Sequence, residues 1–194
     1  PAGVGFAQSS IDLGAEGAGL LPSNPFYFLK EFGRGVRKFL TFNPIKKAEL
    51  ELHVLTEKAA ELKKLEEISP ENIEALTGAA ENYADAADRL RLRLESIKET
   101  SVNSNVDRFL TQLTERGLKH QQLFDDLIVK FEDNQDLQNN LDQLKKKLSV
   151  VIGFGSEKLD TPGKFRVRLL TAINDWKNEN KDLKAAEFID RLEE

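Results

Sequence analysis

The sequence has two histidines, His53 and His120, and they are its strongest candidates for metal binding or proton transfer. His120 shares a three-four apolar spacing with Phe124, so we expect its imidazole to be buried, where it can bind a metal or sense pH. A carboxylate such as Asp125 or Glu57 would complete a metal site with the two histidines, but these residues lack the local spacing that is typical of zinc ligands. We therefore interpret His120 as a core histidine with a hydrogen-bond partner, and both histidines remain weak candidates for a metal site.

A cluster of acidic residues follows His120 along the chain. An EF-hand loop needs acidic or amide side chains at alternate positions and glycine at its sixth position. A loop beginning at Asp133 would have Leu137 at its fifth position and no glycine at its sixth, which favours a solvated helix end over a cation site. The cluster consists of Asp125, Asp126, Glu132, Asp133 and Asp136.

Motifs for other chemistry are missing from the sequence. The Gly-x-Gly pairs at residues 33–35 and 153–155 follow no strand pattern, and neither the phosphate-loop pattern nor the G-x-S-x-G elbow occurs. The absence of cysteine excludes disulfides, thiol catalysis and thiolate metal sites. A net charge of -5 without a nucleic-acid-binding motif argues against nucleic acid as a partner. We expect no enzymatic activity and no cofactor.

Long helices must position these residues. Apolar side chains recur three and four apart over residues 45–62, 73–97 and 106–131, which predicts three amphipathic helices. Asn43 before Pro44 is a typical helix start, because the Asn side chain accepts from free backbone N–H groups and Pro has none to lose. Charged residues from 57 to 64 are expected on the solvent side of the first of these helices.

Breaks in the pattern divide the helices. Ser69 and Pro70 are expected to restart the helix after a short break. The polar stretch Thr100–Asn105 predicts a loop, with Asn103 or Ser104 as the cap of the next helix. The phase of the apolar stripe slips near residues 133–134, which predicts a break before a new stripe over 137–151. Glycines between Gly153 and Gly163 predict a linker, with a last helix beginning at Thr161 and Pro162.

The predicted fold class is all-α, an elongated antiparallel helical bundle, because short connections force consecutive helices to run antiparallel. A short Phe-rich helix begins at Asn24 and Pro25 and is expected to plug one end of the bundle, with extra helices at the C-terminus. The predicted organisation is an extended Gly/Ala/Ser-rich segment over residues 1–24, a bundle over 25–152, and C-terminal helices over 153–194.

Residues 1–24 contain isolated apolar side chains that cannot by themselves offset the entropy of ordering the segment. If this segment is ordered, a groove of its own chain or of a neighbouring copy must hold it; the alternative is a disordered linker that follows a membrane or secretion signal. Copies of this chain are the expected partner. A membrane surface facing the basic residues of 30–38 is an alternative that we favour less. The predicted interaction residues are Phe6, Ile11, Leu13, Leu20, Leu21, Phe26 and Phe28.

The N-terminal residues also bear on localisation. Gly5 and Ala7 are small residues spaced as a signal peptidase requires, three residues and one residue before a cut. No apolar run approaches the roughly 18–20 residues that span a bilayer. We expect the protein to be secreted or associated with the cell envelope.

The stretch from residue 20 to about 130 resembles a family of helical domains of unknown function found in exported bacterial proteins. The matching motifs are Leu21–Pro25 with Tyr27, then Thr41–Pro44, then Lys47–Leu52. The resemblance implies an all-helical fold and export with a signal peptide upstream of position 8, and it carries no catalytic residues. We predict an extracytoplasmic structural or interaction module that self-assembles through its N-terminal segment; the alternative is an exported metal- or stress-binding helical protein.

Overall fold

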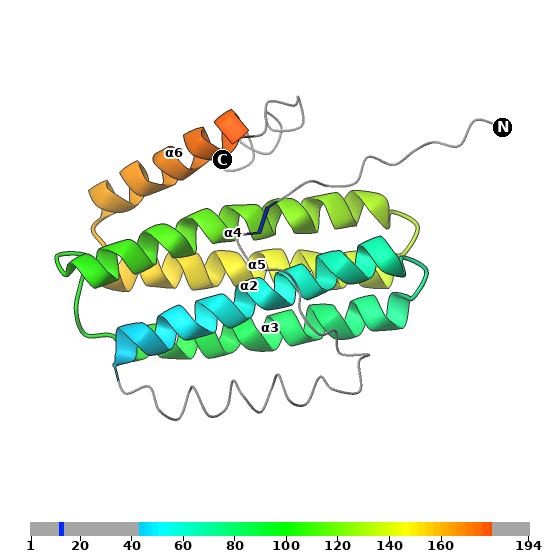
Figure 1. Cartoon of the computed structure of the whole chain (residues 1–194), viewed down its shortest axis with the longest axis horizontal. Coiled ribbons are helices and arrows are strands. Elements are labelled where there is room, and N and C mark those ends of the chain that lie inside the picture. Colours follow the sequence, from blue (N-terminus) through cyan, green and yellow to red (C-terminus); the bar gives the residue numbers. More distant parts are fainter. Residues whose placement is uncertain (1–11, 14–42, 180–194) are drawn as a thin grey trace.

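The computed structural model describes residues 12–13 and 43–179. Within these residues the chain forms helices and no strand, which confirms the predicted all-α class (Figure 1). The helices are α2 (Pro44–Ile68), α3 (Ile73–Ser96), α4 (Ser104–Lys130), α5 (Gln135–Leu159) and α6 (Pro162–Glu179).

Helices α2 to α5 form a four-helix bundle in which each helix runs antiparallel to the one before it in the chain, whereas the neighbours α2 and α4, and α3 and α5, run parallel (Figure 1). Their lengths of 24–27 residues correspond to rods of about 36–40 Å. Around the bundle, α2 packs on α3, α3 on α5, α5 on α4, and α4 on α2. Consequently α3 and α4, although consecutive in the chain, occupy opposite corners, and the connection between them crosses one end of the bundle. Helix α6 lies outside this square, mainly on α4.

The predicted apolar stripes form the core. On α2 the stripe from Ile45 to Leu62 is almost fully buried, and on α3 the stripe is buried from Leu76 to Ile97. The α4 stripe is buried from Val106 to Leu127, including His120. On α5 the buried residues are Leu137, Leu141, Leu144, Leu148 and Val151, as predicted.

Asparagine side chains cap four of the helices at their N-termini. Asn43 Oδ1 accepts hydrogen bonds from the backbone N–H groups of Ile45 and Lys46, at 2.9 and 3.1 Å, and this confirms the predicted start of α2. The predicted cap Asn103 is also confirmed. The break near residues 133–134 is confirmed by the cap at Asn134.

The predicted restart at Ser69 and Pro70 is wrong. Ser69 is the C-cap of α2, and α3 begins only at Ile73. Asn72 caps α3, since its side chain accepts from the backbone N–H of Ala75 at 3.0 Å. The helix therefore starts after the capping residue Asn72, two residues beyond Pro70, and not at Pro70 itself.

The predicted linker from Gly153 to Gly163 is also wrong, because α5 continues through Gly153 and Gly155 to Leu159. Gly155 lies where the helices pack closely: a Cβ atom there would lie 3.2 Å from the Leu113 side chain and 3.6 Å from that of Leu94. Each glycine costs a helix roughly 1 kcal/mol relative to alanine, and packing of the buried α5 stripe offsets this cost. The real break is residues 160–161, and the predicted start of the last helix at Pro162 is confirmed.

Several predictions fall outside the described residues. These are the Phe-rich helix, its basic face over residues 30–38, the chain end after residue 179, and every predicted interaction residue except Leu13, namely Phe6, Ile11, Leu20, Leu21, Phe26 and Phe28.

Candidate functional site

A tyrosine–histidine pair joins the two diagonal helices at the centre of the bundle. Tyr83 Oη on α3 lies 3.0 Å from His120 Nδ1 on α4, and neither residue has any exposed surface. The Tyr83 ring also makes edge-to-face contacts with His120 and Phe124, with ring centroids 5.6 and 4.9 Å apart. The aromatic packing and the hydrogen bond fix the relative positions of α3 and α4.

Burial keeps both members of the pair uncharged. Removal from water, together with the smaller effect of the nearby Arg116 charge, lowers the pKa of His120 to about 3. Burial also raises the pKa of Tyr83 well above its ordinary value. The second ring nitrogen of His120, Nε2, has no hydrogen-bond partner. His120 is thus a core histidine with one partner, and the unpaired Nε2 was not predicted.

The other candidate metal ligands do not converge on this pair. The described residues contain no group of three or more His, Cys, Asp or Glu side chains that could hold a metal ion. His53 is partly exposed on α2, Asp125 forms an ion pair with Lys145 of α5, and Asp133 and Asp136 are exposed at the break before α5. The acidic cluster is therefore split between the α4–α5 interface and a solvated helix start.

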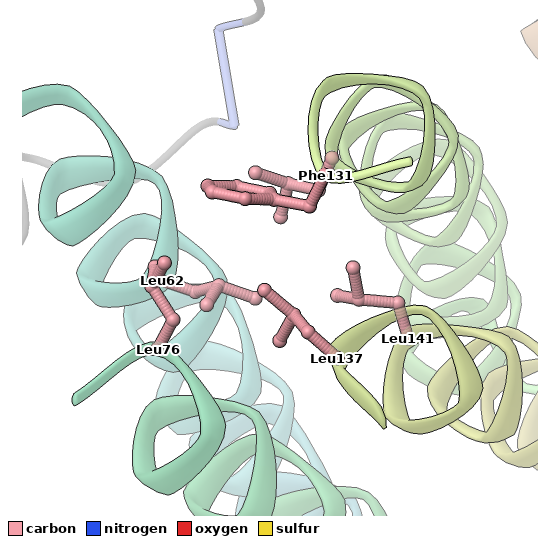
Figure 2. Close-up of a pocket in the computed structure, with 6 residues that line it drawn as sticks. Leu62, Leu76, Phe131, Leu137 and Leu141 are labelled. Carbon is pink, nitrogen blue, oxygen red and sulfur yellow. The ribbon is translucent and has the colours of Figure 1, made fainter. Parts of the chain in front are cut away.

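The interior at the α2–α3 turn end of the bundle is apolar and closely packed. Figure 2 shows the side chains that converge there from all four helices of the bundle. The hollow between them has no room for a water molecule. Its lining residues are Leu62, Leu76, Leu127, Phe131, Leu137 and Leu141.

Helix α2 buries several charged residues, and the prediction that Lys58 and Glu61 lie on the solvent side is wrong. The Lys58 Nζ and Glu61 Oε2 atoms form an ion pair at 3.0 Å, and both side chains are at most 5% exposed. Glu51, 1% exposed, lies between Arg89 and Arg93 of α3, with N–O distances of 3.6 and 3.7 Å. Pairing offsets part of the cost of removing these charges from water. The apolar spacing gave no sign that this second face of α2 would be buried.

Leu13 connects the N-terminal segment to the bundle. Its side chain is 5% exposed and belongs to the same cluster of buried residues as the bundle core. The preceding residue, Asp12, is exposed. Of the predicted interaction residues, Leu13 is the one that the structure describes, and it is buried against its own chain.

A polar network holds the start of α6. The Arg168 guanidinium donates to Asp107 Oδ1 at 2.9 Å, to Asp160 Oδ2 at 3.1 Å, and to the Asp107 backbone carbonyl at 3.0 Å. The hydrogen bond from Arg168 lowers the pKa of Asp107. This network, which sequence reasoning missed, fixes α6 against the first turn of α4.

The far half of α6 packs on α4 and leaves a cleft beside it. A small apolar cluster, separate from the main core, consists of Leu118 with Ala172, Ile173 and Trp176. Trp176 Nε1 donates to Gln122 Oε1 at 2.7 Å. The cleft has a volume of about 370 Å³. It is lined by Glu115, Leu118 and Lys119 of α4 and by Ala172, Asp175, Trp176 and Asn178 of α6.

Comparison with known proteins identifies the family. The profile of a domain of unknown function, DUF5667, matches residues 19–193. The chain belongs to this family. The match is consistent with the resemblance to helical domains of unknown function, and it extends well beyond the end near residue 130 that the motifs suggested. No curated protein and no solved structure matches the chain significantly.

Within the part of the chain that the structure describes, no helix is both long enough and apolar enough to cross a membrane.

Proposed function

We propose that this chain is an extracytoplasmic, non-catalytic interaction module that self-assembles through its N-terminal segment. The observation that carries the proposal is Leu13, whose side chain is buried with the bundle core although it belongs to a Gly/Ala/Ser-rich segment. The bundle thus offers an apolar site for this segment. The segment of a neighbouring copy fits the same site, because the two chains are identical.

Such an exchange creates an oligomer at little cost, since the contacts within one copy are re-formed between copies. If each copy receives the segment of one neighbour and gives its own to another, the contact is head-to-tail. Head-to-tail contacts produce rings when the rotation closes and filaments when it does not.

Analytical ultracentrifugation of the full chain and of two variants tests this proposal. Leu13→Asp places a charge in the apolar site, whereas Asp12→Asn changes the exposed neighbouring residue and is the matched control. We expect the full chain and Asp12→Asn to form oligomers whose mass increases with concentration, and Leu13→Asp to sediment as a monomer with an unchanged helical circular-dichroism spectrum. A monomeric full chain at every concentration, or oligomers of the same mass for Leu13→Asp, would contradict the proposal.

The proposed extracytoplasmic location is supported by the small residues Gly5 and Ala7, which fit a signal-peptidase site. We expect the natural protein recovered from the medium or the envelope fraction to begin at Gln8. N-terminal sequencing of that material measures this directly. Recovery only from the cytoplasmic fraction would contradict export.

A further inference from the structure

We infer that the cleft between α4 and α6 is the docking site for the C-terminal segment of the same chain, residues 180–194, through an apolar face containing Phe188 and Ile189. This contact is independent of the N-terminal assembly site. It would make the end of the chain part of the packed domain.

The cleft suits an amphipathic segment. Leu118, Ala172 and Trp176, each 5% exposed, form the apolar part of its lining, and the charged residues Glu115, Lys119 and Asp175 form part of its polar lining. Its volume of about 370 Å³ is near the lower end of the range for ligand-binding pockets, about 300–1,000 Å³. A few apolar side chains presented by one short segment match this size better than a whole protein surface does.

The position of the chain end favours the segment of the same molecule. Helix α6 ends at Glu179, one residue after Asn178, which itself lines the cleft. The next 15 residues of the sequence therefore begin directly after the edge of the cleft. A short tether of this kind gives an effective concentration in the millimolar range, which favours docking within one molecule over capture of another.

The sequence of residues 180–194 contains the pattern of an apolar helix face that matches the apolar part of the cleft. Ala185, Phe188, Ile189 and Leu192 are spaced i, i+3, i+4 and i+7, the pattern of one apolar helix face. Glu187 falls on the opposite face of the same pattern. The family match also extends to residue 193, so almost the whole segment lies within the matched domain.

Disulfide trapping in the full chain tests the inference cleanly, because the natural sequence has no cysteine. One cysteine replaces a residue beside the cleft, Glu115→Cys or Lys119→Cys, and the second is Ile189→Cys. The control pair substitutes Glu187→Cys for Ile189→Cys. We expect mild oxidation to cross-link the Ile189→Cys pairs within the monomer and to leave the Glu187→Cys pairs mostly reduced.

The fluorescence of Trp176, the only tryptophan in the chain, provides a second readout. Phe188→Asp with Ile189→Asp is expected to shift its emission to longer wavelength and at least double its quenching by acrylamide. Leu183→Asp, outside the apolar face, is expected to change neither. Covalent dimers in place of cross-linked monomers would assign the cleft to a second copy and overturn the inference. Equal cross-linking of both pairs, or unchanged quenching in the double variant, would also overturn it.

Discussion

Acidification should destabilise this bundle through His120. The imidazole is fully buried and its pKa in the folded protein is about 3, against 6.5 for an ordinary histidine. Between these two values the unfolded chain binds a proton that the folded chain does not. The stabilising contribution is therefore complete above about pH 6.5, and it is lost progressively as the pH falls towards 3.

The size of the effect follows from the difference between the two pKa values. At about 1.4 kcal/mol per pKa unit, complete protonation corresponds to about 5 kcal/mol in the free energy of unfolding. At pH 5 the unfolded histidine is already almost fully protonated while the folded one is neutral, and the same linkage gives a loss of about 2 kcal/mol relative to pH 7. A loss of that size is a substantial part of the stability of a typical domain.

Urea unfolding at pH 7, 6 and 5, followed by circular dichroism, measures this loss. His120→Gln removes the titrating group but keeps an acceptor for the Tyr83 hydroxyl, and His53→Gln, at a partly exposed position, is the matched control. We expect the wild type and His53→Gln to lose about 2 kcal/mol more than His120→Gln between pH 7 and pH 5. Equal losses in the free energy of unfolding for all three proteins between pH 7 and pH 5 would show that His120 does not cause the acid destabilisation.

Three further substitutions test other contacts. Tyr83→Phe leaves His120 Nδ1 without its partner, so chemical denaturation should show a loss of about 1–3 kcal/mol. Asn43→Ala removes the acceptor for two backbone N–H groups, and a loss of about 1 kcal/mol is expected from the same measurement, whereas Asn43→Asp should retain most of the stability. Arg168→Ala removes the main cause of the lowered Asp107 pKa, so NMR titration should find that pKa raised towards its ordinary value; an unchanged pKa would show that the contact does not form in solution.

The bundle was predictable because its local and tertiary signals agree. Leu52, Leu90 and Leu148 each lie on a regular three-four stripe, and each is buried where the stripe predicts. Asn43 was readable as a cap because the proline that follows it points to the same helix start. The predicted linker over Gly153–Gly163 was wrong because the sequence does not distinguish a glycine that packs closely within a helix, such as Gly155, from a glycine in a linker.

The central pair was only half predictable. The position of His120 on the α4 stripe indicated burial, but its partner depended on the order of helices around the bundle. Consecutive helices in a bundle are usually neighbours, whereas Tyr83 and His120 meet across the diagonal. The Arg168 network also could not be predicted from the sequence, because it depends on which helices are neighbours. It forms only when α6 packs against the first turn of α4, at Asp107.

The proposed function rests on the N-terminal segment as the element through which copies assemble. Light scattering coupled to size-exclusion chromatography, applied to the full chain and to a chain lacking residues 1–20, tests this most directly. We expect the full chain to have the mass of an oligomer and the shortened chain, with its helical content intact, to have the mass of a monomer. Identical masses for the two proteins would contradict the proposed function.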